Sequence, residues 1–254
     1  MPDSNYSSSD LPEVLRSAFK NGTVFGPEGE SLPLDSNVSL EEATSLYSVV
    51  RRSKPSVSVE VGFAKGVSTL AILQALADNG HGVHHVIDPF QSQFGNAGLE
   101  MVRRAGLESY FQFHETFAEN VIPSLPSIQF AFIDASHLFD LTLLEFVLVD
   151  KKLAFGGVIG FHDLWMPSLR KVLSYILTNR EYQIYAQMDN PEDSKKAMIK
   201  ENFKKNFSRL IARLPNADRI FAPDLLAYLP SLENLTIIEK LKDDNRDWRD
   251  HTNF

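Results

Sequence analysis

The sequence of 254 residues contains no cysteine, which excludes disulfide bonds, thiolate metal sites and cysteine nucleophiles. It also lacks an excess of positive charge. Its 25 Lys and Arg against 33 Asp and Glu give a net charge of −8, which argues against binding to nucleic acid or to acidic membranes. No apolar run is long enough to span a bilayer, and the start, MPDSNYSSSD, has no basic or apolar signal region. We therefore expect a cytoplasmic protein.

The composition that is present, 43% hydrophobic and 23% charged, is typical of a globular chain able to bury a substantial core. We expect residues 1–55 to hold a disordered, Ser-rich start followed by helices, and residues 56–254 to form the main domain. Ser39 and Glu42 form a capping-box pattern that predicts the start of a helix over residues 40–53.

From residue 56 onward, predicted strands and helices alternate. Apolar, β-branched runs predict strands at 56–63, 83–90, 110–116, 128–135, 156–163, 182–187 and 234–241. Helical patterns lie between them at 67–80, 96–107, 118–125, 140–154 and 168–179, and a mostly helical insertion is expected at about 190–230. This alternation predicts a doubly wound α/β fold, in which ligands bind at the carboxyl ends of the strands.

The first of these strand ends carries the segment VEVGFAKGVSTL, residues 59–70. Glu60, Gly62 and Gly66 follow the spacing E-x-G-x-x-x-G, whereas a dinucleotide-binding loop would have G-x-G-x-x-G. Ala64 and Val67 stand where the other two glycines of that motif would be. This motif alone leaves two interpretations open, a tight turn and a cofactor loop for a ligand without a pyrophosphate.

The next strand ends in Asp88, about twenty residues beyond Gly66, which is the offset of a ribose-binding acid. Such an acid can accept hydrogen bonds from both ribose hydroxyls of an adenosine ligand. The alternative is a turn or helix-capping Asp before Pro89. Its combination with Glu60 and Gly62 at the neighbouring strand end favours the ribose role.

Two further strand ends carry acids beside histidines: Asp134 with His137, and His162 with Asp163. Carboxylates from adjacent strand ends can converge, and they then share a proton or bind a cation. The alternative is that both acids cap helices or turns. His137 could act as a general base, since imidazole titrates near neutral pH, or could be an ordinary loop residue.

Taken in order, E-x-G-x-x-x-G, the acid after the second strand, I-D-x-x-H and G-G-V-I-x-x-H-D resemble class I S-adenosylmethionine (SAM)-dependent methyltransferases. The resemblance is strongest to small-molecule O-methyltransferases of the catechol and of the sugar or antibiotic-tailoring type, and it covers about Val38 to Thr178. It implies a Rossmann-like, seven-stranded, mostly parallel sheet with N-terminal helices and a late helical insertion. It also implies O-methylation of a hydroxyl on a small-molecule substrate.

The resemblance assigns roles to individual residues. Glu60 and Gly62 would hold the methionine part of SAM, Asp88 its ribose, and the segment near Phe117 would border adenine. The full cofactor-binding set expected on this basis is Glu60, Gly62, Phe63, Gly66, Asp88, Phe117 and Asp134.

In metal-dependent members, acids matching Asp134 and Asp163 bind a divalent ion such as Mg²⁺, and His137 matches the catalytic base. This chain departs from the family at the third ligand, usually an Asn after the second Asp or an acid before it. Those positions are Leu164 and His162 here. Either His162 is the third ligand, which favours Mn²⁺, Fe²⁺ or Zn²⁺, or the metal is weak or absent.

The chain lacks the motifs that two rival enzyme classes would carry. A short-chain nicotinamide-dependent oxidoreductase would carry Y-x-x-x-K, which this chain does not, and a nucleic-acid amino-methyltransferase would carry an N-P-P-Y-like motif where this chain has DASH. A cofactor-binding protein with a decayed catalytic site stays open. The basic segment 194–213 is interpreted as an amphipathic helix packed on the domain or on a second subunit of a homo-oligomer, with a lid over an anionic substrate as the alternative.

Overall fold

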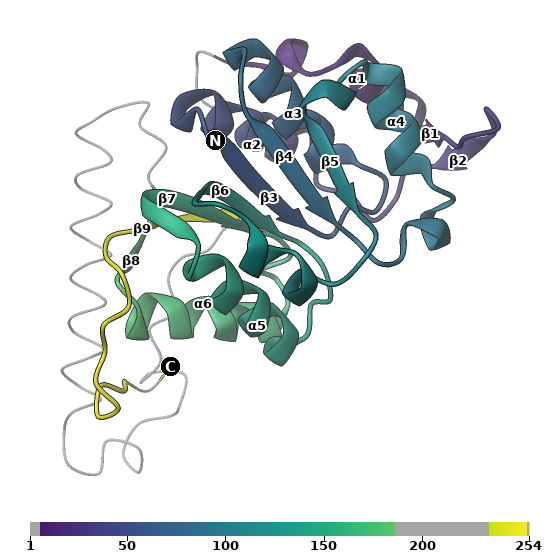
Figure 1. Cartoon of the computed structure of the whole chain (residues 1–254). Coiled ribbons are helices and arrows are strands. Elements are labelled where there is room, and N and C mark those ends of the chain that lie inside the picture. Colours follow the sequence, from purple (N-terminus) through teal and green to yellow (C-terminus); the bar gives the residue numbers. More distant parts are fainter. Residues whose placement is uncertain (1–5, 186–233, 253) are drawn as a thin grey trace.

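The computed structural model describes residues 6–185, 234–252 and 254, and within these residues the main sheet has seven strands (Figure 1). Their order is β5-β4-β3-β6-β7-β9-β8. The strands from β3 to β7 pair in parallel, while β9 pairs antiparallel with both of its neighbours. The strands are β3 Val57–Val61, β4 Val83–Ile87, β5 Phe111–His114, β6 Ile128–Ile133, β7 Leu153–Phe161, β8 Tyr182–Ile184 and β9 Thr236–Lys240. The predicted doubly wound, Rossmann-like fold is confirmed.

Helices cover both faces of this sheet, and Figure 1 shows α3 and α4 on one side and α5 and α6 on the other. The helices are α1 Glu13–Asn21, α2 Leu40–Ser53, α3 Val67–Asn79, α4 Ala97–Ala105, α5 Phe139–Asp150 and α6 Pro167–Asn179. Short 3₁₀ turns are η1 Ser8–Asp10, η2 Gln91–Phe94, η3 Glu108–Tyr110, η4 Ala118–Asn120 and η5 Ile122–Ser124. None of the helices in the described part of the chain is long and apolar enough to cross a membrane.

The central strands are buried on both faces, and their side chains alternate between two hydrophobic clusters. In β6, Phe130 and Phe132 pack with α2, α3 and α4, whereas Ala131 and Ile133 pack with α5 and α6. This follows from the period of two along a strand, combined with helices on each face. Leu15 of α1 belongs to the first cluster, so the N-terminal helices share a core with the main domain.

The capping box of α2 is confirmed. The Ser39 hydroxyl accepts from the Glu42 amide at 3.2 Å, and the Glu42 carboxylate accepts from the Ser39 amide at 2.7 Å. Three expectations differ from the structure. Residues 8–10, expected to be disordered, form η1, capped by Ser7. Residues 118–125 form η4 and η5 instead of one helix, since Pro123 interrupts the backbone bonding.

The third difference is the hairpin of β1 Thr23–Phe25 and β2 Ser31–Pro33, because the sequence analysis predicts no strand before residue 56. The predicted insertion at 190–230 and the basic helix at 194–213 fall outside the described residues.

Strand order reverses between β3 and β6. From β3 the chain crosses to β4 and then β5 on one side, and it returns to β6 on the other. The loops after β3 and β6 therefore leave the sheet in opposite directions, which opens a crevice at their carboxyl ends. Gly62 makes the junction close-fitting: its φ is +96°, and a Cβ there would lie 2.0 Å from the carbonyl oxygen of Asp134.

We predict that Gly62→Ala is much more destabilising than Gly80→Ala. Both glycines have positive φ, +96° and +76°, so each alanine carries a left-handed backbone cost of about 1–2 kcal/mol. Only Gly62→Ala also forces the β3 and β6 loops apart, which adds about 1–3 kcal/mol of overpacking, because no described atom lies within 4 Å of a Cβ at Gly80. Urea denaturation of both variants measures the difference. Equal losses would contradict the close fit at Gly62.

Candidate functional site

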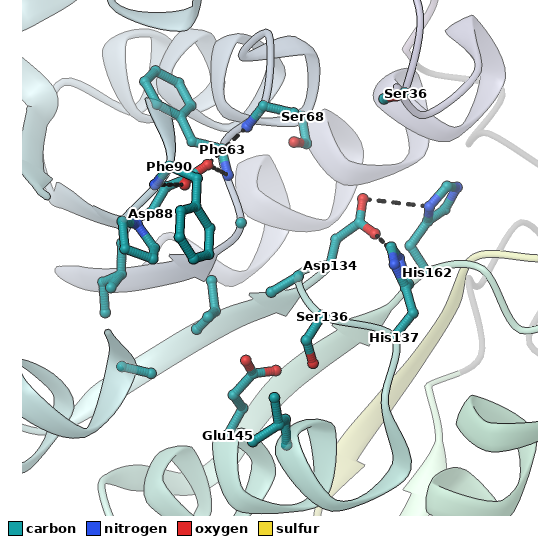
Figure 2. A pocket seen from close by; sticks show the side chains of 18 of the residues that line it. Ser36, Phe63, Ser68, Asp88, Phe90, Asp134, Ser136, His137, Glu145 and His162 are labelled. Carbon is teal, nitrogen blue, oxygen red and sulfur yellow. Dashed lines mark hydrogen bonds and ion pairs between the residues drawn. The ribbon is translucent and has the colours of Figure 1, made fainter. Parts of the chain in front are cut away.

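A cavity of about 880 Å³ opens at the carboxyl ends of β3, β4, β6 and β7. This volume lies within the range of about 300–1,000 Å³ that is usual for small-molecule sites. Figure 2 shows Asp88 and Phe90 on one side of the cavity, with Asp134, His137 and His162 on the other. Strand ends far apart in sequence are therefore brought to one cavity, as the sequence predicts.

Asp88 forms one wall of the cavity and is 5% exposed. One of its carboxylate oxygens accepts from the amides of Phe63 and Ala64 at 3.0 and 3.1 Å, and the other accepts from the Phe90 amide at 2.7 Å. Asp88 thus ties the glycine loop to the end of β4. A carboxylate has about four acceptor sites, so three amides leave room for a hydroxyl.

Glu60 lies behind the cavity wall and is fully buried. Its carboxylate accepts from the hydroxyls of Ser68 and Thr69 in the first turn of α3, and it lies 2.9 Å from Nε2 of His84. The structure therefore places Glu60 where it fixes the start of α3 and the glycine loop, and does not place it in contact with the cavity. No pattern in the sequence indicates this buried pairing between neighbouring strands.

The two phenylalanines of the predicted cofactor set lie differently. Phe117 is 51% exposed on the cavity rim and packs edge-to-face with Phe90, their ring centroids 5.9 Å apart. The Phe63 ring is buried against Phe111 and Phe113, so only the backbone of Phe63 faces the cavity. Phe90, which the sequence analysis missed, belongs to the cavity wall. Gly66 begins α3 in the left-handed conformation.

Across the cavity, His137 lies between the two predicted acids. Its Nε2 is 3.1 Å from Oδ1 of Asp134 and 3.1 Å from Oδ2 of Asp163 (Figure 2 shows the Asp134 contact). Trp165 donates its indole N–H to Asp163 at 3.0 Å. The expected convergence of two carboxylates at adjacent strand ends is thus present, with His137 bridging them.

His162 is 6% exposed and reaches the same acids from behind. Its Nδ1 lies 3.3 Å from Asp134 and 3.5 Å from Asp163, yet makes no hydrogen bond of good geometry among the described residues. Its Nε2 lies 3.3 Å from the carboxylate of Glu42 in α2. One atom each from Asp134, His162 and Asp163 fall within 4.8 Å of one another, a spacing suited to a metal ion.

These contacts shift the protonation of the cluster. Burial raises the pKa of Asp134, but bonding to His137 and His162 outweighs it and holds the pKa at about 2. Burial lowers the pKa of His162, but the carboxylates of Asp134 and Glu42 outweigh it and raise the pKa to about 10. Bonding to Asp134 raises the pKa of His137, and bonding to His162 lowers that of Glu42 to about 2. Without another cation, His162 is therefore protonated at neutral pH, and the neighbouring acids favour the protonated form of His137.

The backbone at this cluster is unusual. His137 and Asp163 have φ of +57° and +56°, a left-handed region that side chains with a Cβ seldom adopt. His137 lies four residues beyond the end of β6, and Asp163 lies two residues beyond the end of β7. Conformations of this kind concentrate at functional sites.

Glu145 of α5 is a cavity residue that the sequence analysis missed. Figure 2 shows its carboxyl group directed toward the cavity, and its Oε2 has no hydrogen-bond partner among the described residues. Burial raises the pKa of Glu145 to about 7. One acid within the otherwise apolar stretch LTLLEFVLV was the available signal.

We predict that the free energy of unfolding of Glu145→Gln, measured relative to the wild type, increases as the pH rises. Glu145 titrates at about 7 when folded against an ordinary value of 4.5. Its favourable contribution is therefore complete below pH 4.5 and is lost as the pH rises through 7. Urea denaturation at pH 5 and pH 8 should show a larger advantage for the Glu145→Gln variant at pH 8, with Glu181→Gln as the exposed control. A pH-independent difference would mean that Glu145 is solvated.

Residues 59–164 match a protein family described as a methyltransferase domain. A caffeoyl-CoA O-methyltransferase of Stellaria longipes is 30% identical over 129 residues, which are 46% of this chain and 50% of that protein. The chain thus matches about half the length of this relative. The segment matched by the family contains the glycine loop, Asp88, Asp134, His137 and Asp163.

Two solved structures share the fold. The O-methyltransferase from Bacillus cereus, in complex with SAH, has a TM-score of 0.55 and 17% identity, over 70% of this chain and 82% of that one. The O-methyltransferase TomG from Streptomyces achromogenes, in complex with SAM, has a TM-score of 0.52 and 15% identity, over 95% of this chain and all of that one. The chain therefore shares its fold with these two O-methyltransferases, and its residues 59–164 match the methyltransferase-domain family.

Proposed function

We propose that this protein transfers the methyl group of SAM to a hydroxyl of a small molecule, with assistance from a divalent metal. The observation that carries the proposal is the meeting, in one cavity, of the glycine loop, Asp88 and the acid–histidine cluster. Methyl transfer needs a donor site beside a place where a hydroxyl can be oriented and deprotonated. The cavity offers both on opposite walls.

The residues present fit SAM. The free acceptor capacity of Asp88 suits ribose hydroxyls, and the exposed faces of Phe90 and Phe117 suit a flat adenine ring. Gly62 and Asp134 would lie toward the methionine part. Glu60 would act through the loop, because its carboxylate faces α3. When bound, SAM supplies the electrophilic methyl group.

The residues present also fit a divalent metal. Asp134 and Asp163 offer oxygens, and the unpartnered Nδ1 of His162 offers a nitrogen. A metal held there lowers the pKa of a hydroxyl and orients it. Leu141 and Leu144, both partly exposed on the cavity side, add an apolar wall that suits the hydrocarbon body of an acceptor such as an aromatic ring.

His137 is the proposed base. The carboxylates of Asp134 and Asp163 favour the protonated form of His137, so neutralising those charges would make His137 a readier proton acceptor. The same bridge supports a second candidate, a SAM-binding protein whose catalytic site has decayed. Turnover by the wild type separates the two.

The finer points of organisation are proposals as well. We place the methyltransferase domain at residues 56–254, preceded by helices over residues 1–55. The absence of cysteine is compatible with a cytoplasmic location, and residues 194–213 are the candidate contact for a second subunit.

We predict that Asp88→Ala weakens SAM binding about tenfold to a hundredfold, the usual cost of losing a hydrogen bond to a charged group. Calorimetric titration of wild type and variant with SAM and with S-adenosylhomocysteine measures this. Asp163→Asn is the control, since it lies on the opposite wall and Asn tolerates the positive φ. Unchanged affinity in Asp88→Ala would remove the ribose role, and binding of NAD(H) alone would overturn the cofactor assignment.

We predict that His137→Asn lowers turnover about a hundredfold to ten-thousandfold while leaving SAM affinity nearly unchanged. Asn is preferred to Ala because it accepts a φ of +57°. A panel of catechols, flavonoids and sugar-bearing natural products supplies the acceptors. His81→Asn, an exposed position on another loop, is the control. Full turnover in His137→Asn would mean that His137 is not the base. If the wild type binds SAM but turns over no acceptor, the second candidate, a protein with a decayed catalytic site, is favoured.

A further inference from the structure

Glu42 holds His162 on the side away from the cavity. Glu42 belongs to α2, more than a hundred residues earlier in the chain, and its Oε2 lies 3.3 Å from Nε2 of His162. Its Oε1 accepts from the side-chain amide of Asn234, just before β9, at 3.1 Å. Neither Glu42 nor Asn234 lines the cavity. His162 is thus held from behind by residues of two distant segments.

The opposite ring nitrogen of His162 faces the cavity cluster. Nδ1 is buried and without a hydrogen-bond partner among the described residues, although it points at the carboxylates of Asp134 and Asp163. Nδ1 is therefore held near the two acids by charge, without a well-aligned hydrogen bond, which is a position where a cation could take the place of the proton. The candidate ligand atoms of these three side chains lie within 4.8 Å of one another.

A histidine that binds a metal through one nitrogen usually donates its other N–H to a carboxylate, which fixes the tautomer and the ring orientation. Building on the metal site of the proposed function, we propose that Glu42 is this outer carboxylate. By holding the N–H on Nε2, it makes Nδ1 of His162 a metal ligand beside Asp134 and Asp163. A mixed set of two oxygens and one imidazole favours Mn²⁺ and later transition metals over Mg²⁺.

The opposite tautomer is the competing arrangement. The Asn234 amide nitrogen also lies 3.0 Å from Nε2 of His162, so it could donate there while Nδ1–H bonds to Asp134. That arrangement would point the Nε2 lone pair at a carboxylate oxygen of Glu42 only 3.3 Å away. A carboxylate accepts and does not donate, so Glu42 favours the proton on Nε2, whereas the closer amide nitrogen of Asn234 favours the lone pair there. Binding of a metal at Nδ1 would select the first of these tautomers.

Glu42→Gln is the informative variant because a capping box accepts Gln as well as Glu, so the start of α2 is kept while the charge is lost. We expect Mn²⁺ binding, followed by electron paramagnetic resonance without SAM or acceptor, to weaken about tenfold to a hundredfold. The matched control is Ser39→Ala, which removes the other half of the same capping box and leaves Glu42 in place. It should lower stability and leave Mn²⁺ affinity unchanged.

Anomalous scattering from wild-type crystals soaked in Mn²⁺ should place the ion within ligand distance of Nδ1 of His162. Equal Mn²⁺ affinity in Glu42→Gln and wild type, or an ion held by Asp134 and Asp163 without the imidazole, would overturn the proposal. No Mn²⁺ binding by the wild type would also overturn it. SAM titration of the same preparations without added metal is a separate measurement, so intact SAM binding would show that the cofactor assignment survives such a failure.

Discussion

The reversal of strand order between β3 and β6 is the constraint on which the site depends. Because the chain leaves these neighbouring strands in opposite directions, their carboxyl ends stay open, and Asp88, Asp134 and Asp163 reach the cavity from strand ends or from the loops beyond them. The loops remain close only because Gly62 has no side chain against the Asp134 carbonyl. The close packing at Gly62 therefore fixes the position of the cavity wall that holds Asp88 relative to the opposite wall, which holds Asp134 and His162.

The second constraint on the site is the balance of charge within the acid–histidine cluster. Glu42, Asp134 and Asp163 bring three carboxylates together with only two imidazoles, His137 and His162. Burial alone would favour neutral carboxyls, yet the pKa of Asp134 and that of Glu42 are both held at about 2, so the histidines supply the compensating charge. Two imidazoles can offset at most two of these three negative charges, and a divalent cation could bind beside the acids only if the nitrogen of His162 that faces them gave up its proton.

Much of this was predictable from the sequence, for identifiable reasons. Seven strands and the capping box of Ser39 and Glu42 follow from local patterns, and the convergence of Asp134 and Asp163 follows from topology. The remainder depends on contacts distant in sequence. No local pattern shows that Glu60 turns toward α3 or that the Phe63 ring enters the core. The β1–β2 hairpin has strands of three residues, too short for a period of two to register.

Glu42 shows most clearly that a residue with a known local role can make a second contact that the sequence does not indicate. As the third residue of a capping box it is fully explained by helix chemistry, and nothing in the sequence calls for a second function. In the structure, the same carboxylate that accepts from the Ser39 amide also faces His162, so the start of α2 and the candidate metal cluster share one group. At the position where the metal-dependent proteins that the sequence resembles usually have an amide or acid ligand, this chain has His162. A histidine that binds a metal usually donates its other N–H to a carboxylate. Helix α2 places a carboxylate at that nitrogen, so in our proposal it supports the site as well as the core.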